Sequence, residues 1–265
     1  MKNYRPRVEK KEVDGKRGIK SFVLRTGSLS IYQKKALELY SDAYSLPYKD
    51  EYLDLKTIFA KKNPTIIEIG FGMGDATKRI AKEQSDKNFI AVEVFLSGFT
   101  KLLDFAGKEE SENLRLIRFD AVSVINDMIE DNSISGFHIF FPDPWPKKKH
   151  QKRRLIQYEF ASLLARKLIP GGYIYCVTDW NEYAYQMLEV FEKVPSLINN
   201  SDGFCEPISW RPTTSFEKKG KEKEHEIFEV WVEKSGRREP HGSDLPHHQR
   251  HTVRYRAVQS NDTTN

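Results

Sequence analysis

The sequence predicts an α/β fold built around a mainly parallel sheet with helices on both faces. From Thr65 onwards the chain contains five short runs rich in Ile, Val and Phe, and stretches with helical spacing separate them. Strands that are apolar along their whole length, rather than at every second position, are typical of parallel sheets covered on both faces. The five runs are TIIEIG, FIAVEV, LRLIRFDA, FHIFFPD and GYIYCVTD.

The segment before the sheet begins with a basic arm. Residues 1–35 carry eleven Lys or Arg against three acidic residues, and residues 1–30 show few apolar positions and no clear period. We therefore expect residues 1–30 to be flexible without a partner. An amphipathic pattern starts near Ser30 and predicts a first helix, and a shorter helix is expected over residues 49–62.

A longer helix is predicted between the fourth and fifth apolar runs, over residues 151–168. Leu155 and Ile156 open its apolar side, which continues with helical spacing to Leu168. Pro170-Gly171-Gly172 then forms a stop signal.

The last part of the chain divides into a strand and a tail. Residues 227–232 alternate between apolar and polar side chains, which predicts a late strand. Residues 236–265 lose all apolar periodicity and are rich in His, Arg, Ser and Pro, so we expect a disordered tail. Residues 31–235 are thus predicted to form a single domain.

Composition narrows the class of protein. The formal net charge is only +5, but the positive charge concentrates in residues 1–35 and 147–154. The two cysteines, Cys176 and Cys205, match no metal spacing and suit a reducing compartment. No apolar run approaches the ~20 residues that span a bilayer, and the N-terminus lacks the apolar core of a signal peptide. We expect a soluble cytoplasmic protein without a metal site or a membrane partner.

A glycine-rich turn follows the first strand directly. Gly70, Gly72 and Gly74 form a GxGxG pattern, which differs from the GxGxxG of dinucleotide-binding turns. Glycines in this place allow a tight turn and a close approach of the backbone to a ligand. Glu68 lies two positions before the first glycine, and the resulting ExGxGxG is the pattern of methyltransferases that use S-adenosylmethionine.

Two more carboxylates end the next two strands. Glu93 ends the second strand, and its two oxygens match the two vicinal hydroxyls of a ribose; the alternative is a solvated strand-end acid. Asp120 ends the third strand and could accept the adenine amino group, although Asp is also a common helix N-cap. All of these side chains would lie along the carboxyl edge of the sheet, where open α/β folds bind ligands.

The fourth strand ends in Pro-Asp-Pro-Trp-Pro. Pro142 and Pro144 restrict the backbone on both sides of Asp143, and Trp145 offers a flat face on which a base could stack. A plain proline turn with a buried Trp is the alternative. The run KKKHQKRR follows at once, and cations at the start of a helix oppose its dipole, so a polyanion is expected to neutralise them. The simpler alternative is a solvated helix start.

Taken together, IEIGFGMGD, AVEV, FPDPWPKKKHQKRR, TDW and RPTTSFEKKG resemble the bacterial tRNA (guanine-N7-)-methyltransferase family, as does RTGSLSIYQ near the N-terminus. The resemblance covers residues 15–233 in the order and spacing of the family. It implies a Rossmann-like class I methyltransferase fold with a mainly parallel seven-stranded sheet and S-adenosyl-L-methionine as the cofactor. It also implies methyl transfer to N7 of guanine 46 in the variable loop of tRNA.

The resemblance also implies roles for individual residues. Asp143 corresponds to the proposed catalytic residue. The cofactor-binding positions are Glu68, Gly70, Gly72, Gly74, Glu93, Asp120 and Asp143. The substrate-binding positions are Lys147, Asp179, Thr214, Ser215, Phe216 and Glu217, and the RNA-binding positions are Arg25, Lys149, His150, Gln151, Lys152, Arg153 and Arg154. Ser215 stands where the family usually has Lys, and Lys218 or Lys219 could replace that phosphate contact.

The chemistry of guanine supports one mechanism from the residues alone. N7 carries a lone pair and no proton, so its methylation needs orientation and a favourable field rather than a general base. We expect Asp143 to accept hydrogen bonds from guanine N1–H and the 2-amino group. Three alternatives remain at this point, namely an amino-methyltransferase acting on adenine or cytosine of nucleic acid, a nicotinamide-dependent oxidoreductase and a non-catalytic RNA-binding module. No obligate protein partner is implied, and the protein is expected to be a monomer or homodimer.

Overall fold

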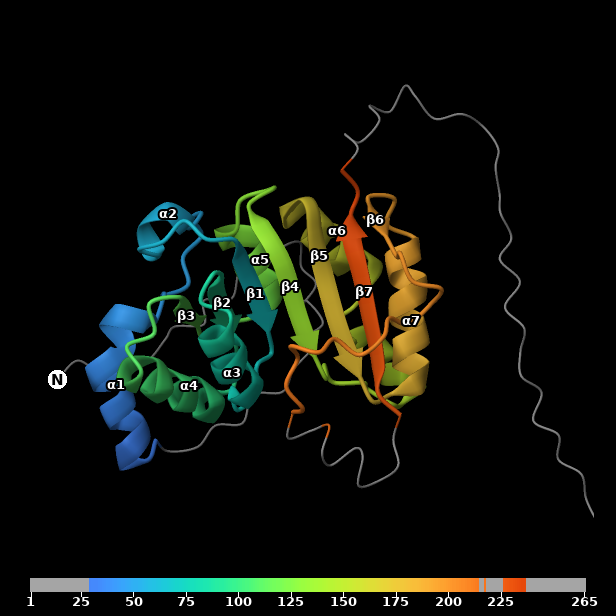
Figure 1. The fold of residues 1–265 in the computed structure, drawn as a ribbon. Helices are drawn as coiled ribbons and strands as arrows, with labels where there is room; N and C mark the ends of the chain where they lie inside the picture. Colours follow the sequence, from blue (N-terminus) through green and yellow to red (C-terminus); the bar gives the residue numbers. More distant parts are fainter. Residues whose placement is uncertain (1–28, 215–216, 218–225, 237–265) are drawn as a thin grey trace, which may run out of the picture.

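The structure is a computed structural model, and it describes residues 29–214, 217 and 226–236. Its centre is a seven-stranded sheet in the order β3-β2-β1-β4-β5-β7-β6 (Figure 1). Strands β1 to β5 pair in parallel, whereas β7 runs antiparallel to both β5 and β6. The predicted α/β fold with a mainly parallel sheet is confirmed. The strands are β1 (Thr65–Ile69), β2 (Asn88–Val92), β3 (Leu114–Ile117), β4 (Ile134–Phe140), β5 (Leu168–Thr178), β6 (Leu197–Ile198) and β7 (Phe228–Lys234).

Helices cover both faces of the sheet (Figure 1). One face carries α3 (Asp75–Glu83) and α4 (Leu96–Lys108), and α1 (Ile31–Tyr44) packs on α4. The other face carries α5 (Ala121–Met128), α6 (Tyr158–Lys167) and α7 (Asn181–Glu192). Two short helices complete the described chain, α2 (Leu55–Ile58) and the 3-10 helix η1 (Lys148–Arg153).

The central strands are apolar throughout because side chains on both faces are buried. All five residues of β1 and all five of β2 are buried. Ile66 belongs to the core on the α3 and α4 side, whereas Ile67 and Ile69 belong to the core on the α5, α6 and α7 side. A strand of this kind has no polar face, which is why the sequence shows runs rather than alternation.

The first helix, α1, begins where the sequence predicts. Ser30 is the N-cap of α1: its hydroxyl accepts a hydrogen bond from Gln33 N, and the Gln33 side chain accepts one from Ser30 N. This reciprocal pair is a capping box, which satisfies two backbone donors at the start of the helix. The helix predicted over residues 49–62 is wrong in length, because only α2 forms there. Leu53 N instead donates to Met128 O at 2.8 Å.

The helix predicted over residues 151–168 is also wrong at its start. The basic residues form η1, the chain then turns, and α6 begins only at Tyr158. Ile156, which the pattern places inside the helix, is fully buried, and its N–H donates to the Tyr183 hydroxyl at 3.0 Å instead of to a helical carbonyl. The apolar spacing that imitates a helix comes from Leu155 and Ile156 packing individually on the core.

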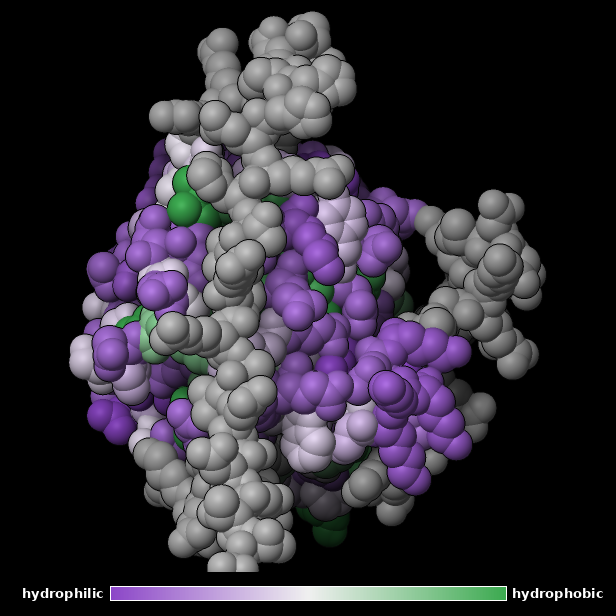
Figure 2. Space-filling model, turned by 90° about the vertical axis from the view of Figure 1, so that its right-hand side faces the viewer, coloured by the Kyte–Doolittle hydropathy of each residue, from purple (hydrophilic) through white to green (hydrophobic). Residues whose placement is uncertain are grey.

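The surface shows no membrane-spanning element in the part of the chain that the structure describes, since none of its helices is long and apolar enough to cross a bilayer. The side of the molecule at the α7 end is mainly hydrophilic, with small scattered apolar spots (Figure 2). Residues 1–28 of the basic arm predicted over residues 1–30, and residues 237–265 of the tail predicted over residues 236–265, lie outside the described residues.

Candidate active site

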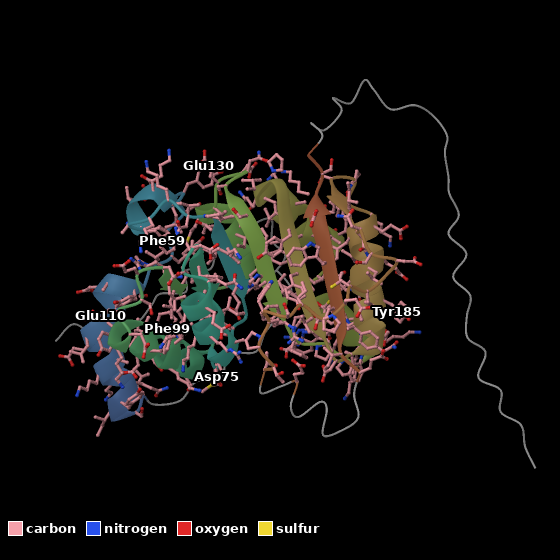
Figure 3. All side chains as sticks on the ribbon, in the orientation of Figure 1. Phe59, Asp75, Phe99, Glu110, Glu130 and Tyr185 are labelled. Atoms are coloured by element: carbon pink, nitrogen blue, oxygen red, sulfur yellow. The ribbon has the colours of Figure 1, made fainter. Side chains whose placement is uncertain are left out.

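A cavity of about 490 Å³ opens at the carboxyl edge of the sheet, and residues from the ends of β1, β2, β3 and β4 line it. Asp75, at the start of α3, marks this edge, and Glu130 lies at the opposite edge (Figure 3). The predicted positions Glu68, Gly70, Gly72, Gly74, Glu93, Asp120, Asp143 and Thr214 all line this one cavity. Residues up to 146 positions apart in the chain are therefore brought together, as the expected carboxyl-edge site requires.

The glycine turn has the backbone conformation that glycine allows. Gly70, Gly72 and Gly74 have φ angles of 75°, 57° and 74°, in the left-handed region where side chains are disfavoured. A Cβ atom on Gly98, in the first turn of α4, would lie 1.7 Å from Gly72 O. Gly98 therefore has no room for a side chain, and α4 presses directly on the turn. The sequence reasoning missed Gly98, because nothing near it in the chain marks a contact with the glycine turn.

Glu68 lines the cavity as a buried carboxylate. Its Oε2 atom finds no hydrogen-bond partner among the described residues. Burial, partly offset by the nearby Thr77 hydroxyl, raises the pKa of this carboxyl to about 7. An unsatisfied buried acceptor is costly, so this position fits a ligand that brings a cation or an N–H donor. The ammonium end of a sulfonium amino acid is a ligand of that kind.

Glu93 holds the glycine turn from the next strand. One carboxylate oxygen accepts a hydrogen bond from Gly72 N at 2.8 Å, and the other accepts from Val94 N and Phe95 N at 2.7 and 2.9 Å. Burial raises the pKa of Glu93, and these three hydrogen bonds oppose that shift. A carboxylate has about four acceptor positions, so three are already used within the protein. Glu93 therefore organises the turn, and its predicted contact with both ribose hydroxyls stays a prediction.

Asp120 is the N-cap of α5. Its Oδ2 atom accepts hydrogen bonds from Ser123 N and Ser123 Oγ, each at 3.0 Å. The capping alternative left open by the sequence is thus confirmed. Because the residue also lines the cavity, the contact with an adenine amino group remains a prediction beside it.

The Pro-Asp-Pro-Trp-Pro loop is held in an uncommon conformation. Phe141, directly before the loop, and Trp145, within it, have φ angles of 51° and 43°. Non-glycine residues in this region are strained, and such strain gathers at functional sites. Phe141 N donates to Val177 O at 2.7 Å, which ties the loop to β5. Asp143 is exposed at the cavity, where partial loss of water raises the pKa of its carboxyl and the charge of Arg153 opposes the shift.

Trp145 is already covered on one side. The Arg153 guanidinium lies 3.8 Å from the centre of the Trp145 ring, and the His150 ring meets Trp145 edge-on at 5.9 Å. The face that the sequence suggested for a base is thus in contact with Arg153 in this structure. Stacking on Trp145 would require either its other face or movement of Arg153.

The basic run does not start a long helix. Lys147, Lys148, Lys149 and Lys152 are exposed on and beside η1, and His150, Gln151 and Arg153 are half-buried. The argument that these cations oppose the dipole of a long helix is therefore wrong, because α6 starts only at Tyr158. Their exposure leaves the lysines available to phosphates.

Arg154 differs from the rest of the run. The residue is 3% exposed, and its Nε–H donates to Pro144 O at 2.8 Å. A guanidinium inside the protein cannot contact tRNA phosphates in this arrangement. The predicted RNA contact of Arg154 is corrected accordingly. Arg154 belongs to the basic run in the sequence, but unlike the lysines of the run it is buried.

The segment that carries Thr214 is anchored by a buried ion network. Arg211 lies 2.6 Å from Glu217 Oε2 and 2.6 Å from Glu229 Oε1, and its Nε donates to the Tyr175 hydroxyl at 2.9 Å. Glu217, predicted to bind substrate, is 4% exposed and has its carboxylate on Arg211 instead. Sequence reasoning missed the roles of Arg211, Tyr175 and Glu229, although Arg211 belongs to the quoted RPTTSFEKKG motif.

The remaining predicted substrate residues are spread along the chain. Asp179 follows Thr178 at the end of β5 and is half-buried, and Trp180 N donates to Thr178 Oγ1 at 3.2 Å where α7 begins. Ser215, Phe216 and Arg25 lie outside the described residues. The roles predicted for Lys147 and Asp179 stay predictions.

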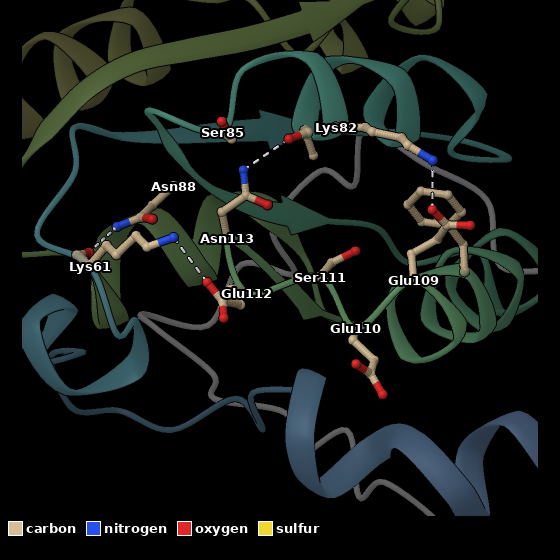
Figure 4. A pocket seen from close by; sticks show the side chains of 11 residues that line it. Lys61, Lys82, Ser85, Asn88, Glu109, Glu110, Ser111, Glu112 and Asn113 are labelled. Atoms are coloured by element: carbon tan, nitrogen blue, oxygen red, sulfur yellow. Dashed lines mark hydrogen bonds and ion pairs between the residues drawn. The ribbon is translucent and has the colours of Figure 1, made fainter.

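A second cavity, of about 240 Å³, lies at the opposite edge of the sheet (Figure 4). Four of its charged side chains form two ion pairs: Lys61 with Glu112 at 3.0 Å and Lys82 with Glu109 at 2.7 Å. Asn113 donates to Ala81 O at 2.9 Å. These polar groups already satisfy each other, so the cavity at the carboxyl edge is the candidate active site.

Comparison with known proteins agrees with the fold. A family model described as "Putative methyltransferase" matches residues 62–230. The crystal structure of the 16S rRNA methyltransferase KamB aligns with a TM-score of 0.52 over 70% of this chain and 95% of that chain. At 12% identity it supports the fold alone, and the predicted Rossmann-like class I methyltransferase fold is confirmed.

Curated relatives are similar over most of their length. A tRNA (guanine-N(7)-)-methyltransferase of Bordetella pertussis is 45% identical over 82% of this chain and 85% of the relative. Its counterpart in Cupriavidus metallidurans is 46% identical over 83% of this chain and 85% of the relative. That of Chromobacterium violaceum is 45% identical over 81% of this chain and 95% of the relative. The chain belongs to the tRNA (guanine-N7-)-methyltransferase family.

Proposed function

We propose that this protein transfers a methyl group from S-adenosyl-L-methionine to N7 of guanine 46 in the variable loop of tRNA. The observation that carries the proposal is the position of Asp143. Its carboxylate is held by a strained loop at the mouth of the same cavity that contains the glycine turn and Glu68. A base that meets Asp143 is thereby brought close to whatever fills the cavity.

The cavity residues fit the methyl donor in two respects. Glu68 supplies an unsatisfied buried acceptor for the ammonium group, and the left-handed glycine turn allows close approach of its backbone. Glu93 and Asp120 line the part that would receive the ribose and the adenine. When bound, S-adenosyl-L-methionine supplies an electrophilic methyl group on a positively charged sulfur.

Asp143 orients the guanine and selects it. Its two oxygens accept hydrogen bonds from guanine N1–H and the 2-amino group, a donor pair that adenine does not present. The carboxylate charge also favours the positive charge that develops on the purine ring as N7 is methylated. No proton has to leave N7, so the site needs no general base.

The exposed lysines of η1 give the site its affinity for RNA. Lys148, Lys149 and Lys152 project beside the Asp143 loop, and phosphate contacts of this kind position a nucleic acid without reading its sequence. Arg153 adds a positive charge that reaches toward Asp143 and Trp145.

The test is an assay of two tRNA transcripts that differ only at position 46, one with guanine and one with adenine. Purified protein and isotopically labelled S-adenosyl-L-methionine are added, and the products are digested and identified by nucleoside mass spectrometry. We expect 7-methylguanosine from the first transcript only. Methylated adenosine or cytidine amino groups would instead identify an amino-methyltransferase, and no product from any transcript would contradict the proposal.

A further inference from the structure

We infer that Arg154 is a positioning residue, which acts through the Pro144 carbonyl to hold Asp143 in place against helix α7. The inference rests on the proposed function, because it concerns how the Asp143 loop reaches the geometry for methyl transfer. It assigns to Arg154 a role different from that of the basic residues beside it.

The contact with the loop is direct and enclosed. Arg154 Nε–H donates to Pro144 O at 2.8 Å, and the Arg154 side chain is 1% exposed. Pro144 follows Asp143 in the chain, and its ring restricts φ. Fixing the Pro144 carbonyl fixes the peptide plane that leads to the left-handed Trp145, and the restricted φ of Pro144 limits how the preceding plane, which follows the exposed Asp143, can turn.

The other contacts of the Arg154 guanidinium are with helix α7. Arg154 Nη1 donates to Gln186 Oε1 at 2.5 Å, and Nη2 lies 3.6 Å from Glu182 Oε1. The Tyr183 ring centre is 5.0 Å from the guanidinium carbon of Arg154. Gln186 in turn donates to Ile156 O at 3.2 Å, and the Tyr183 hydroxyl accepts from Ile156 N at 3.0 Å. The loop, the turn after η1 and α7 are thus joined through one guanidinium.

Burial decides between positioning and phosphate binding. An arginine that releases counterions from RNA has to reach the phosphate surface, and Arg154 cannot without leaving its partners. A buried guanidinium is costly unless its donors are used. Nε and Nη1 are used here on the loop and on α7, and Nη2 has only the longer ion pair with Glu182. The donors of a guanidinium lie on three nitrogens of a planar fork and can reach two elements at fixed angles, whereas a lysine carries its three donors on one nitrogen.

Arg153 provides the contrast. It is half-buried, it stacks on Trp145 and its charge acts on Asp143. The two neighbouring arginines therefore have different roles. Arg153 acts on Trp145 and Asp143, whereas Arg154 fixes the Pro144 carbonyl to α7.

The test compares Arg154→Met, which keeps the unbranched stem of the side chain but removes its donors, with Arg154→Lys, which retains the charge but carries its donors on a single nitrogen. Arg166→Met is the matched control, because the Arg166 side chain is exposed and pairs with Asp131 at 3.2 Å. For Arg154→Met we expect kcat to fall by roughly 100-fold, the loss that a displacement of about 1 Å can cause. The slope of log tRNA affinity against log salt should equal that of the unchanged protein. Arg154→Lys should have an intermediate kcat, and the control should match the unchanged protein.

A second readout follows the loop itself. The chain has four tryptophans, so protein labelled with 5-fluorotryptophan gives four ¹⁹F resonances, and Trp145→Phe assigns the one in the loop. We expect Arg154→Met and Arg154→Lys to shift or broaden the Trp145 resonance and to leave the Trp231 resonance in place. If Arg154→Met unfolds, Arg154→Lys carries both measurements.

The outcomes separate the inference from the proposed function. An unchanged kcat and Trp145 resonance in the Arg154 variants would overturn the inference, and so would a reduced salt slope, which would return Arg154 to phosphate binding. A protein without any substitution that forms no 7-methylguanosine would overturn the proposed function instead.

Discussion

Arg211 and Glu229 join the loop that carries Thr214 to strand β7 through a buried ion pair of 2.6 Å. The Tyr175 hydroxyl also donates to Glu229, and Ile208 N donates to the same carboxylate at 3.2 Å. Through these contacts, the loop through which Thr214 lines the cavity is attached to strands β5 and β7 of the sheet, and not to the glycine turn. Stability and site geometry depend on the same guanidinium here.

Replacing Arg211 by Met should destabilise the protein strongly. Glu217 and Glu229 would remain buried without their cation, and breaking a buried pair in this way costs about 3–5 kcal/mol. Urea unfolding gives the free energy. Arg79→Met is the control: its pair with Glu83 is exposed, so about 0.5 kcal/mol or less is expected. A loss for Arg211→Met as small as that of the control would contradict the network.

The buried Glu68 should make the protein without cofactor less stable as the pH rises. Its pKa is about 7 in the folded state and about 4.5 in the unfolded state, so between these values the folded protein binds more protons. The free energy of unfolding therefore falls from pH 4.5 to pH 7, by about 3 kcal/mol from this group. Glu68→Gln should remove this part of the slope and weaken cofactor binding. Unfolding curves at several pH values and calorimetric titration measure both, and an equal pH slope in the two proteins would contradict the assignment.

Gly98→Ala should disturb the glycine turn. The added Cβ would meet Gly72 O at 1.7 Å, so either α4 or the turn must move, and overpacking of this kind costs about 1–3 kcal/mol. We expect the Kd for S-adenosyl-L-methionine to rise roughly tenfold or more, since 1.4 kcal/mol corresponds to tenfold. Gly171→Ala is the control, because a Cβ there meets nothing within 4 Å. Its φ of 77° makes it slightly destabilising, but its cofactor affinity should not change.

Asp143→Asn should lower kcat more than it weakens tRNA binding. The amide has one acceptor oxygen and one NH₂ group, so its NH₂ side faces a guanine donor instead of accepting from it, and its neutral side chain no longer stabilises the positive charge on the ring. Loss of one such contact typically reduces kcat by about 10²–10³. Single-turnover methyl transfer at saturating tRNA measures the effect, and a near-normal rate would refute the role of Asp143.

Lys148→Ala combined with Lys152→Ala should weaken tRNA binding in a salt-dependent way. Each phosphate contact that is lost reduces the slope of log affinity against log salt by about 1, so the pair should reduce it by about 2. Lys61→Ala combined with Lys82→Ala is the control, since these residues pair with glutamates at the opposite edge of the sheet. Filter binding over a salt series gives both slopes, and equal slopes for the two double variants would exclude η1 from the RNA surface.

Most of the sheet could be predicted because each strand carries its own signal. The apolar runs from Thr65 to Thr178 became β1 to β5, and the alternating residues near Val230 became β7. The glycine turn and the strand-end acids met at one cavity, because parallel strands place their carboxyl ends at a common edge. The two-residue strand β6 had no such signal, being too short for a pattern.

Helical spacing was less reliable where tertiary contacts competed with it. Leu155 and Ile156 imitate the apolar side of a helix, but the chain turns there because Ile156 N bonds to Tyr183 on α7. Leu53 likewise bonds to Met128 rather than within a helix. Both partners are distant in sequence, so a local pattern contains no information about them.

The sequence by itself determined the fold class, the segments that form the main strands and the residue types that gather at the cavity. These depend on local composition and on the geometry of parallel sheets. Only the tertiary structure decided what each charged residue does. Arg153 and Arg154 are identical neighbours, yet one stacks on Trp145 beside Asp143 and the other is buried on Pro144 and α7. Glu217 meets Arg211 inside the protein for the same reason. The sequence does not show whether a charged side chain points to solvent or into the protein, and the role of that side chain depends on which of the two occurs.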